Sequence, residues 1–278
     1  MLKHREAIIR LLKDDDPQTV LLIKNQLATG GADTIADLRD LLSLDDEEVT
    51  FHIRDVLGEI QTREAKNDLQ GICRNIRTQE ELEEACWLIA QVFLPGVETG
   101  HYNARINEWA KMLRDRLPVG ASELQQTQIL THLMGRELGF RGNSEDYYNL
   151  KNSLLPCVID SRLGIPISLS VLYIAVARRA AMRVEGINLP GHFVVRLGSV
   201  LFDPFHDGRV LTPRDCAEIL ARQKLTLEPA HLQLASPRLV LLRMLANLLY
   251  IFEGEDDSDL QQQVKGWIRL LDPKYLSS

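Results

Sequence analysis

Two residues, His192 and Asp203, have the clearest chemical potential in this sequence. A carboxylate that binds a histidine fixes its tautomer and stabilises its charged form, which suits the histidine to act as a base beside a nucleophile. The same pair also serves in many proteins as a purely structural bridge. The residue types leave both roles open, so the pair is a candidate catalytic dyad and a candidate bridge.

The local sequence predicts that these two side chains meet across a hairpin. Residues 193–197 and 200–202 are apolar stretches typical of strands, and Gly198-Ser199 between them is typical of a two-residue turn. In the register that this turn imposes, His192 and Asp203 project from the same face as diagonal neighbours. We therefore predict a hydrogen bond between their side chains.

Covalent catalysis would also need a nucleophile beside the pair. The start of a helix is a favourable place, because a helix N-terminus lowers the pKa of a thiol. Residues 168–179 are apolar nearly all round and predict a buried helix with Pro166 in its first turn. Ser168 occupies the expected position but also suits a helix cap. Cys157 is the other candidate, although it precedes this helix and reaches the pair only by an unusual packing.

Five further residues are candidates for lining a cleft beside the pair, because they are aromatic or polar and border apolar segments. They are Tyr147, Tyr148, Asn149, Arg162 and Arg196. An arginine in such a cleft could bind a carboxylate ligand. Each has a structural alternative: the tyrosines could pack beneath the buried helix, and the arginines could form ion pairs with Asp160 or Asp203.

The elements around this centre are mainly helical. Residues 6–116 repeat apolar side chains at three- and four-residue steps. Acidic turns at 14–16 and 45–48 are typical either of a degenerate helical-hairpin repeat or of helix caps. Two more helices flank the acidic stretch 253–259. We therefore predict a mostly helical α+β fold with a short antiparallel sheet, divided into a helical region (1–116), a central core (117–229) and a helical hairpin (230–278).

Five motifs occur together in the central part of the chain. They are Asn143–Asn149, Asn152-Ser153, Asp160–Ser170, Pro190–Arg196 and Asp203-Pro204-Phe205. In combination they resemble the SirB/YchA family of bacterial proteins. The resemblance implies a papain-like, transglutaminase-like core with a helical region before it and a tetratricopeptide-like hairpin after it. It matches His192 and Asp203 to the superfamily's histidine and aspartate. It places the nucleophilic cysteine near Ile167 or Ser168, where this sequence has none.

Composition and charge exclude several classes of protein. The net charge is −7, with 32 basic and 39 acidic residues, and direct nucleic-acid binding needs concentrated Lys and Arg. Apolar runs fall short of the ~20 residues of a membrane span, and the first residues lack a signal-peptide pattern. We therefore expect a cytoplasmic protein that binds neither membranes nor nucleic acid.

The cysteines give no sign of a zinc site or of a disulfide framework. Cys73, Cys86, Cys157 and Cys216 lie far apart in the sequence and form no Cys-x-x-Cys pair. The sequence therefore predicts reduced thiols, no metal site and no cofactor.

Three functions fit these observations. The leading one is a non-catalytic regulatory protein that binds a protein or peptide partner, and the resemblance implies an indirect effect on the expression of a virulence regulator. The first alternative is a thiol hydrolase or acyltransferase with Cys157, His192 and Asp203. The second is a helical-repeat scaffold.

Overall fold

The computed structural model describes residues 5–255 and 257–277. These residues are mostly helical and include a small antiparallel sheet, which confirms the predicted α+β class. The chain divides into two compact units. The first unit comprises Met1–Leu69 and Leu88–Glu98, and the second comprises Gln70–Trp87 and Thr99–Ser278.

The first unit is a group of helices around an apolar core. Its helices are α1 (Arg5–Leu12), α2 (Pro17–Ala28), α3 (Ala32–Leu41) and parts of α4 (Glu47–Asn75) and α5 (Gln79–Phe93). The acidic turns of this region cap helices. Asp16 accepts a hydrogen bond from Gln18 N at 3.1 Å, and Asp46 accepts one from Val49 N at 3.2 Å. Of the two predicted roles for the acidic turns, the structure therefore shows the cap.

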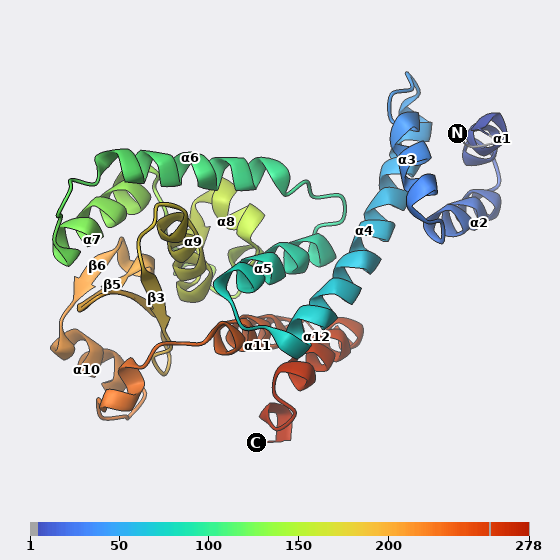
Figure 1. The fold of residues 1–278 in the computed structure, drawn as a ribbon. Helices are drawn as coiled ribbons and strands as arrows, with labels where there is room; N and C mark the ends of the chain where they lie inside the picture. Colours follow the sequence, from blue (N-terminus) through green and yellow to red (C-terminus); the bar gives the residue numbers. More distant parts are fainter. Residues whose placement is uncertain (1–4, 256, 278) are drawn as a thin grey trace. The chain divides into compact units, whose positions relative to one another are not determined.

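The second unit is built around helix α9 (Pro166–Arg179), the buried helix that the sequence predicted. Its residues from Pro166 to Ala177 are all buried. Helix α6 (Gly100–Arg116) packs along it, and the sheet covers another side (Figure 1). Proline at the first helical position begins α9 without losing a hydrogen bond, because the first amide groups of a helix lack intrahelical partners.

The sheet has the strand order β3-β4-β5-β6 and is antiparallel throughout. Its strands are β3 (Val184–Ile187), β4 (Val194–Leu197), β5 (Val200–Asp203) and β6 (Arg209–Leu211). Leu197 pairs with Val200, so the predicted two-residue turn and its register are confirmed. Gly198 adopts a φ of 56° in this turn, a conformation that favours glycine. Strands β1 (Arg141–Gly142) and β2 (Leu163–Gly164) pair in parallel with each other and form a separate two-stranded sheet.

The remaining elements of the second unit surround α9 and the sheet. The helices are α7 (Glu123–Thr131), α8 (Leu155–Ser161), α10 (Pro213–Ala221), α11 (Pro237–Gly254) and α12 (Ser258–Leu271). The short turns are the π-helix η1 (His132–Glu137) and the 3-10 turns η2 (Leu150–Ser153), η3 (Pro204–His206), η4 (Pro229–Leu232) and η5 (Tyr275–Ser277). Helices α11 and α12 pack together as the predicted hairpin, and α11 also contacts α9.

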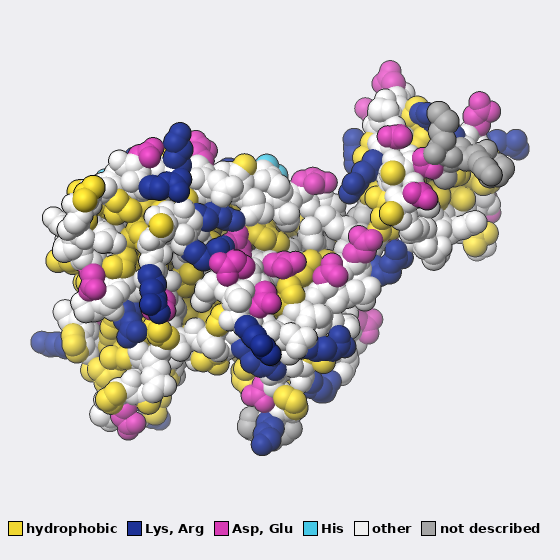
Figure 2. Space-filling view, in the orientation of Figure 1, with side chains coloured by type: hydrophobic (Ala, Val, Ile, Leu, Met, Phe, Trp, Pro, Cys, Tyr) yellow, Lys and Arg dark blue, Asp and Glu magenta, His cyan; other side chains and the backbone are white. Residues whose placement is uncertain are grey.

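The two compact units do not follow the expected divisions at residues 116 and 229. The reason is tertiary packing: α6 and α11 both contact α9 and therefore join the same unit as the sheet. Acidic and basic side chains are interspersed on the face shown in Figure 2. Within the described residues, no helix combines the length and apolar character that a membrane span requires.

Replacing a core leucine of α9 should destabilise the second unit. Leu172 is fully buried, and Leu172→Ala is expected to lower the free energy of unfolding by about 2–5 kcal/mol, because it leaves a cavity. The tryptophans Trp87, Trp109 and Trp267 all belong to this unit, so their fluorescence during urea unfolding measures it selectively. Leu225 is 43% exposed, and Leu225→Ala should change the free energy of unfolding by less than about 0.5 kcal/mol. Equal losses in the two variants would contradict the assigned core.

Candidate functional site

The hydrogen bond predicted between His192 and Asp203 is present. Nε2 of His192 lies 2.7 Å from Oδ2 of Asp203, and the two side chains are 10% and 2% exposed. Since Nε2 faces the carboxylate, Nδ1 is the imidazole nitrogen left for another partner.

The turn before β4 fixes the position of His192. Its backbone N–H donates to Leu189 O at 2.9 Å, and Gly191 adopts a φ of 77° between them. The Arg243 side chain on α11 donates to Leu189 O at 3.0 Å and also to Asn188 Oδ1. Helix α11 therefore supports the turn that aims His192 at Asp203.

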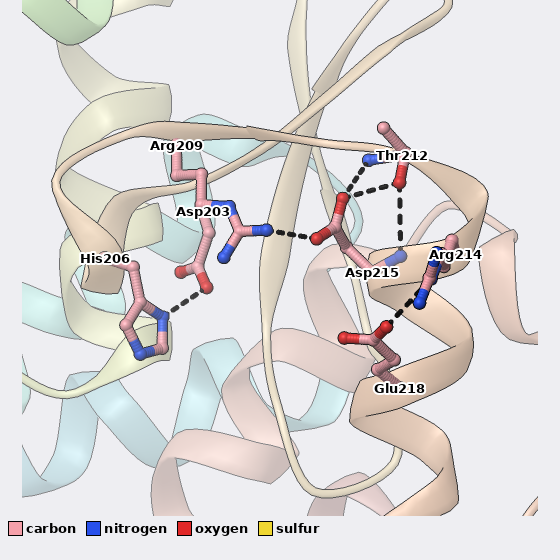
Figure 3. Close-up of polar contacts among 7 residues, drawn as sticks. All are labelled: Asp203, His206, Arg209, Thr212, Arg214, Asp215 and Glu218. Carbon is pink, nitrogen blue, oxygen red and sulfur yellow. Dashed lines mark hydrogen bonds and ion pairs between the residues drawn. The ribbon is translucent and has the colours of Figure 1, made fainter.

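A second histidine, His206, completes the cluster and was missed by the sequence reasoning. Its Nδ1 lies 2.7 Å from the same Oδ2 of Asp203, while its side chain is 60% exposed (Figure 3). The turn η3 brings it there, since Pro204 begins η3 and Phe205 N donates to Asp203 Oδ1 at 2.9 Å. The signal that could have found it is the Asp-x-x-His spacing directly after a strand.

The charges of the cluster explain its protonation. Burial alone would raise the pKa of Asp203, but the hydrogen bonds from His192 and His206 outweigh it and hold this pKa far below its usual range. The hydrogen bond to Asp203 in turn raises the pKa of His206. Asp203 is therefore a carboxylate anion at neutral pH, with hydrogen-bond donors around both of its oxygens.

The loop that carries His206 fits against glycines. A Cβ on Gly142 would lie 2.5 Å from the Phe205 ring, and a Cβ on Gly208 would lie 2.5 Å from Thr131. A Cβ on Gly135, in the π-helix η1, would lie 3.2 Å from Asp207 O. Larger residues at these positions would collide with the loop. Glycine therefore leaves the space in which the loop can bring His206 to Asp203.

Ser168 is not available as a nucleophile, because its hydroxyl is fully used inside the core. The residue is completely buried. Its Oγ donates to Asn152 O at 2.6 Å and accepts from Ile165 N at 3.1 Å. Of the two roles considered for Ser168, the structure shows the cap that ties the start of α9 to η2.

Cys157 lies on α8 and is half-buried. Burial raises the pKa of its thiol, and the charged groups that act on it are Lys151 and Asp160. Within the described residues, the metal-ligating atoms gathered with those of His192 and Asp203 include no cysteine sulfur. Lys151 acts to lower the pKa of the thiol, but burial outweighs it, and the sulfur does not belong to the His192 cluster that the thiol-enzyme alternative requires.

The two candidate arginines have other partners. The Arg162 guanidinium lies over Trp109 at 5.0 Å and over Phe140 at 4.6 Å from the ring centroids. Arg196 donates to Leu232 O at 3.5 Å. Neither arginine forms the considered ion pair among the described residues, because Asp160 binds Tyr102 and Arg105 while Asp203 binds the histidines.

The candidate tyrosines do approach the cluster, through an aromatic chain. Tyr147 packs edge-on against Phe205 with ring centroids 6.1 Å apart, and Phe205 packs edge-on against His192 at the same separation. Tyr148 contacts Tyr147 and Tyr250, at 5.1 and 4.7 Å. Asn149 has a structural role instead, since its side chain accepts from Lys151 N at 2.9 Å and caps η2.

Comparison with known proteins agrees with this arrangement. The sequence profile of the transglutaminase-like superfamily matches residues 100–246, from the first residue of α6 into α11. A UPF0162 protein of Pseudomonas aeruginosa is 32% identical over 189 residues, which cover 65% of this chain and 69% of the relative. The chain belongs to the transglutaminase-like superfamily and to the UPF0162 proteins.

Two other relatives are matched over smaller fractions of their own lengths. A UPF0162 protein of Xylella fastidiosa (strain Temecula1) is 33% identical over 62% of this chain and 65% of the relative, so the chain spans just under two thirds of that relative's length. The human F-box only protein 21 is 35% identical over 150 residues, which are 48% of this chain but 23% of that protein. No solved structure matches significantly.

Removing the Ser168 hydroxyl should test its structural role. Ser168→Ala leaves Asn152 O with a long 3.4 Å contact from Ile165 N, and we expect the second unit to lose about 1–2 kcal/mol of its free energy of unfolding. Ser170 is a matched control, because its Oγ donates to Pro166 O within the same helix and alanine suits a helix interior. Ser170→Ala should therefore destabilise the second unit less than Ser168→Ala does, because the Pro166 carbonyl keeps its backbone hydrogen bond within the helix. A stable Ser168→Ala protein would contradict the cap.

The Cys157 thiol should react slowly with iodoacetamide at neutral pH. A raised pKa leaves a smaller thiolate fraction than in an ordinary cysteine, so alkylation, followed by mass spectrometry, should be slower than that of a free cysteine peptide. His192→Ala should leave the rate unchanged. A fast reaction that His192→Ala slows would instead support the thiol-enzyme alternative.

Proposed function

We propose that this UPF0162 protein is a non-catalytic regulatory protein of the SirB/YchA type, whose second unit binds a peptide segment of a protein partner. A His–Asp pair can orient or hydrogen-bond a ligand, but covalent catalysis also needs a nucleophile. Ser168 is committed to its cap, and Cys157 has no activating contact with the pair. Both observations favour binding over catalysis.

The proposed binding site is a pocket of about 270 Å³. Its lining residues are Tyr147, Tyr148, Ser153, Ile165, Ala246, Asn247, Tyr250 and Ile251. Tyrosine side chains present both apolar faces and polar tips, which is typical of sites that bind peptides. The volume suits one apolar or aromatic side chain rather than a large cofactor.

One observation carries this proposal: the Ser153 hydroxyl is buried without a hydrogen-bond partner among the described residues. Ser153 is 5% exposed and lines the tyrosine pocket. An unpaired buried hydroxyl is costly, and a polar atom of a ligand would remove that cost. The expected ligand therefore combines an apolar or aromatic body with a polar atom that reaches Ser153.

The pocket adjoins the His192 cluster through shared aromatic residues. Tyr147 lines the pocket and contacts Phe205, which contacts His192. The chain of a bound peptide could therefore pass from the pocket towards His192. In this proposal the dyad serves as part of the binding surface.

The comparisons support the view that the shared part of this chain is a domain that also occurs within a larger, otherwise different protein. The stretch shared with F-box only protein 21 makes up only 23% of that protein. The net charge of −7 favours a protein partner over nucleic acid, so any effect on expression, including that of a virulence regulator, would be indirect. The four free cysteines suit a reducing compartment, and we place the binding in the cytoplasm.

A displayed library of random peptides, selected on the full chain, tests this proposal. The Kd of selected peptides should rise at least about tenfold in Ala246→Leu, which fills the pocket, and about three- to tenfold in Ser153→Ala, which loses one hydrogen bond. Ala104 on α6 is exposed and does not line the pocket, so Ala104→Leu should leave the Kd unchanged. Circular dichroism should show the same fold in all three variants.

Three results would overturn the proposal. Failure to select any peptide would remove the binding function. Peptides that bind Ala246→Leu as tightly as the wild type would move binding away from the pocket and favour the helical-scaffold alternative. Cleavage or acyl transfer that mass spectrometry detects in the wild type but not in His192→Ala would establish an enzyme.

A further inference from the structure

The cluster at the end of β5 has the composition of a transition-metal site. The possible ligand atoms of His192, Asp203 and His206 all lie within 4.8 Å of one another. The two imidazole nitrogens each lie 2.7 Å from Asp203 Oδ2. We propose that these three side chains bind one divalent transition-metal ion of the Zn²⁺ type and leave a coordination position open. This inference goes beyond the proposed peptide binding, with which it shares His192 and Asp203.

The donor set decides which ions fit. Two imidazoles and one carboxylate are the protein ligands of several catalytic zinc sites and of the facial triad that binds Fe²⁺. Ca²⁺ and Mg²⁺ prefer oxygen ligands throughout and would gain little from two histidines. The site should therefore select Zn²⁺ or Co²⁺ over Ca²⁺ and Mg²⁺.

The ligand atoms must move to receive the ion, because Oδ2 lies 2.7 Å from each imidazole nitrogen while all three atoms lie within 4.8 Å of one another. Zinc–nitrogen bonds of about 2.0–2.1 Å in a tetrahedron place neighbouring ligand atoms about 3.3 Å apart, a little more than the 2.7 Å observed. The exposed His206 side chain can make this movement. Phe205 N holds the other carboxylate oxygen, which fixes the orientation of Asp203, as outer-shell hydrogen bonds do in metal sites.

Metal binding would redistribute protons within the cluster. An imidazole binds a metal through an unprotonated nitrogen. A neutral ring that directs its hydrogen at Oδ2 would carry that hydrogen on the other ring nitrogen instead, and a doubly protonated ring would release one proton. With an ion on Nε2, the ring hydrogen of His192 occupies Nδ1, so the metal site suits a protein in which this histidine does not act as a catalytic base.

Beside the cluster there is space for a further ligand. Asp203 and His206 line a hollow of about 100 Å³ together with Arg209, Asp215 and Arg222, among others. This volume holds a water molecule, whose share of liquid volume is about 30 Å³. The Arg209 guanidinium turns to Asp215, away from His206 (Figure 3), and among the described residues Asp203 has no ion pair with Arg209. A water can therefore fill the open position.

Titration of the EDTA-treated full chain with Co²⁺ and Zn²⁺ tests the site. One equivalent of Co²⁺ should give visible absorption bands of a four- or five-coordinate ion, and calorimetry should show one Zn²⁺ bound with a micromolar or lower Kd. His206→Ala should raise this Kd by at least about tenfold. Loss of a residue that only supports a metal ligand already weakens metal binding by about that factor, and His206 is a direct ligand in this proposal. Because His206 is exposed, the variant should keep its fold.

Matched controls separate this site from others. His132 is exposed, with Glu137 as its ionic partner at 3.3 Å, so His132→Ala should bind Zn²⁺ as the wild type does. Asp203→Asn should weaken binding like His206→Ala. Absence of binding at millimolar Zn²⁺ would overturn the proposal, and so would stoichiometric binding that His206→Ala leaves unchanged.

Discussion

The buried Asp203 carboxylate is the charge around which the candidate site is arranged. Removing a carboxylate from water costs several kcal/mol unless hydrogen bonds replace the lost hydration. Here the replacements are His192, His206 and the backbone N–H of Phe205. These donors come from two elements: His192 from the turn before β4, and Phe205 and His206 from η3. The hairpin register, the turn η3 and the support from α11 must therefore form together for the charge to be tolerated.

This UPF0162 protein combines a transglutaminase-like sequence with a serine, Ser168, at the start of α9, where the family resemblance places a cysteine. Helix α9 still begins beside the site, but Ser168 turns its hydroxyl inward and joins α9 to η2. This bond also positions the neighbourhood of Ser153, the residue that lines the tyrosine pocket. The start of α9 thus contributes to the wall of the tyrosine pocket. The family resemblance places a nucleophilic cysteine at this same point of the chain.

The sequence was sufficient for features that depend on neighbouring residues. Alternating strands and the Gly198-Ser199 turn set the His192–Asp203 contact, and the apolar stretch after Pro166 predicted α9. It was insufficient where long-range packing decides. His206 reaches Asp203 only because Pro204 turns the backbone after β5, and Arg162 stacks on rings that no local pattern places beside it. The unit boundaries likewise depend on how α6 and α11 pack on α9.

The loop around His206 packs closely against glycines, since a Cβ on Gly142 or Gly208 would lie 2.5 Å from the side chain of Phe205 or Thr131. This part of the site therefore has little room for larger residues at these glycine positions. The exposed imidazole of His206 lies largely outside that fit. Evolution could therefore exchange this one side chain and retune the chemistry of the site while leaving its scaffold intact. Related chains with the same dyad can in this way differ in what they bind.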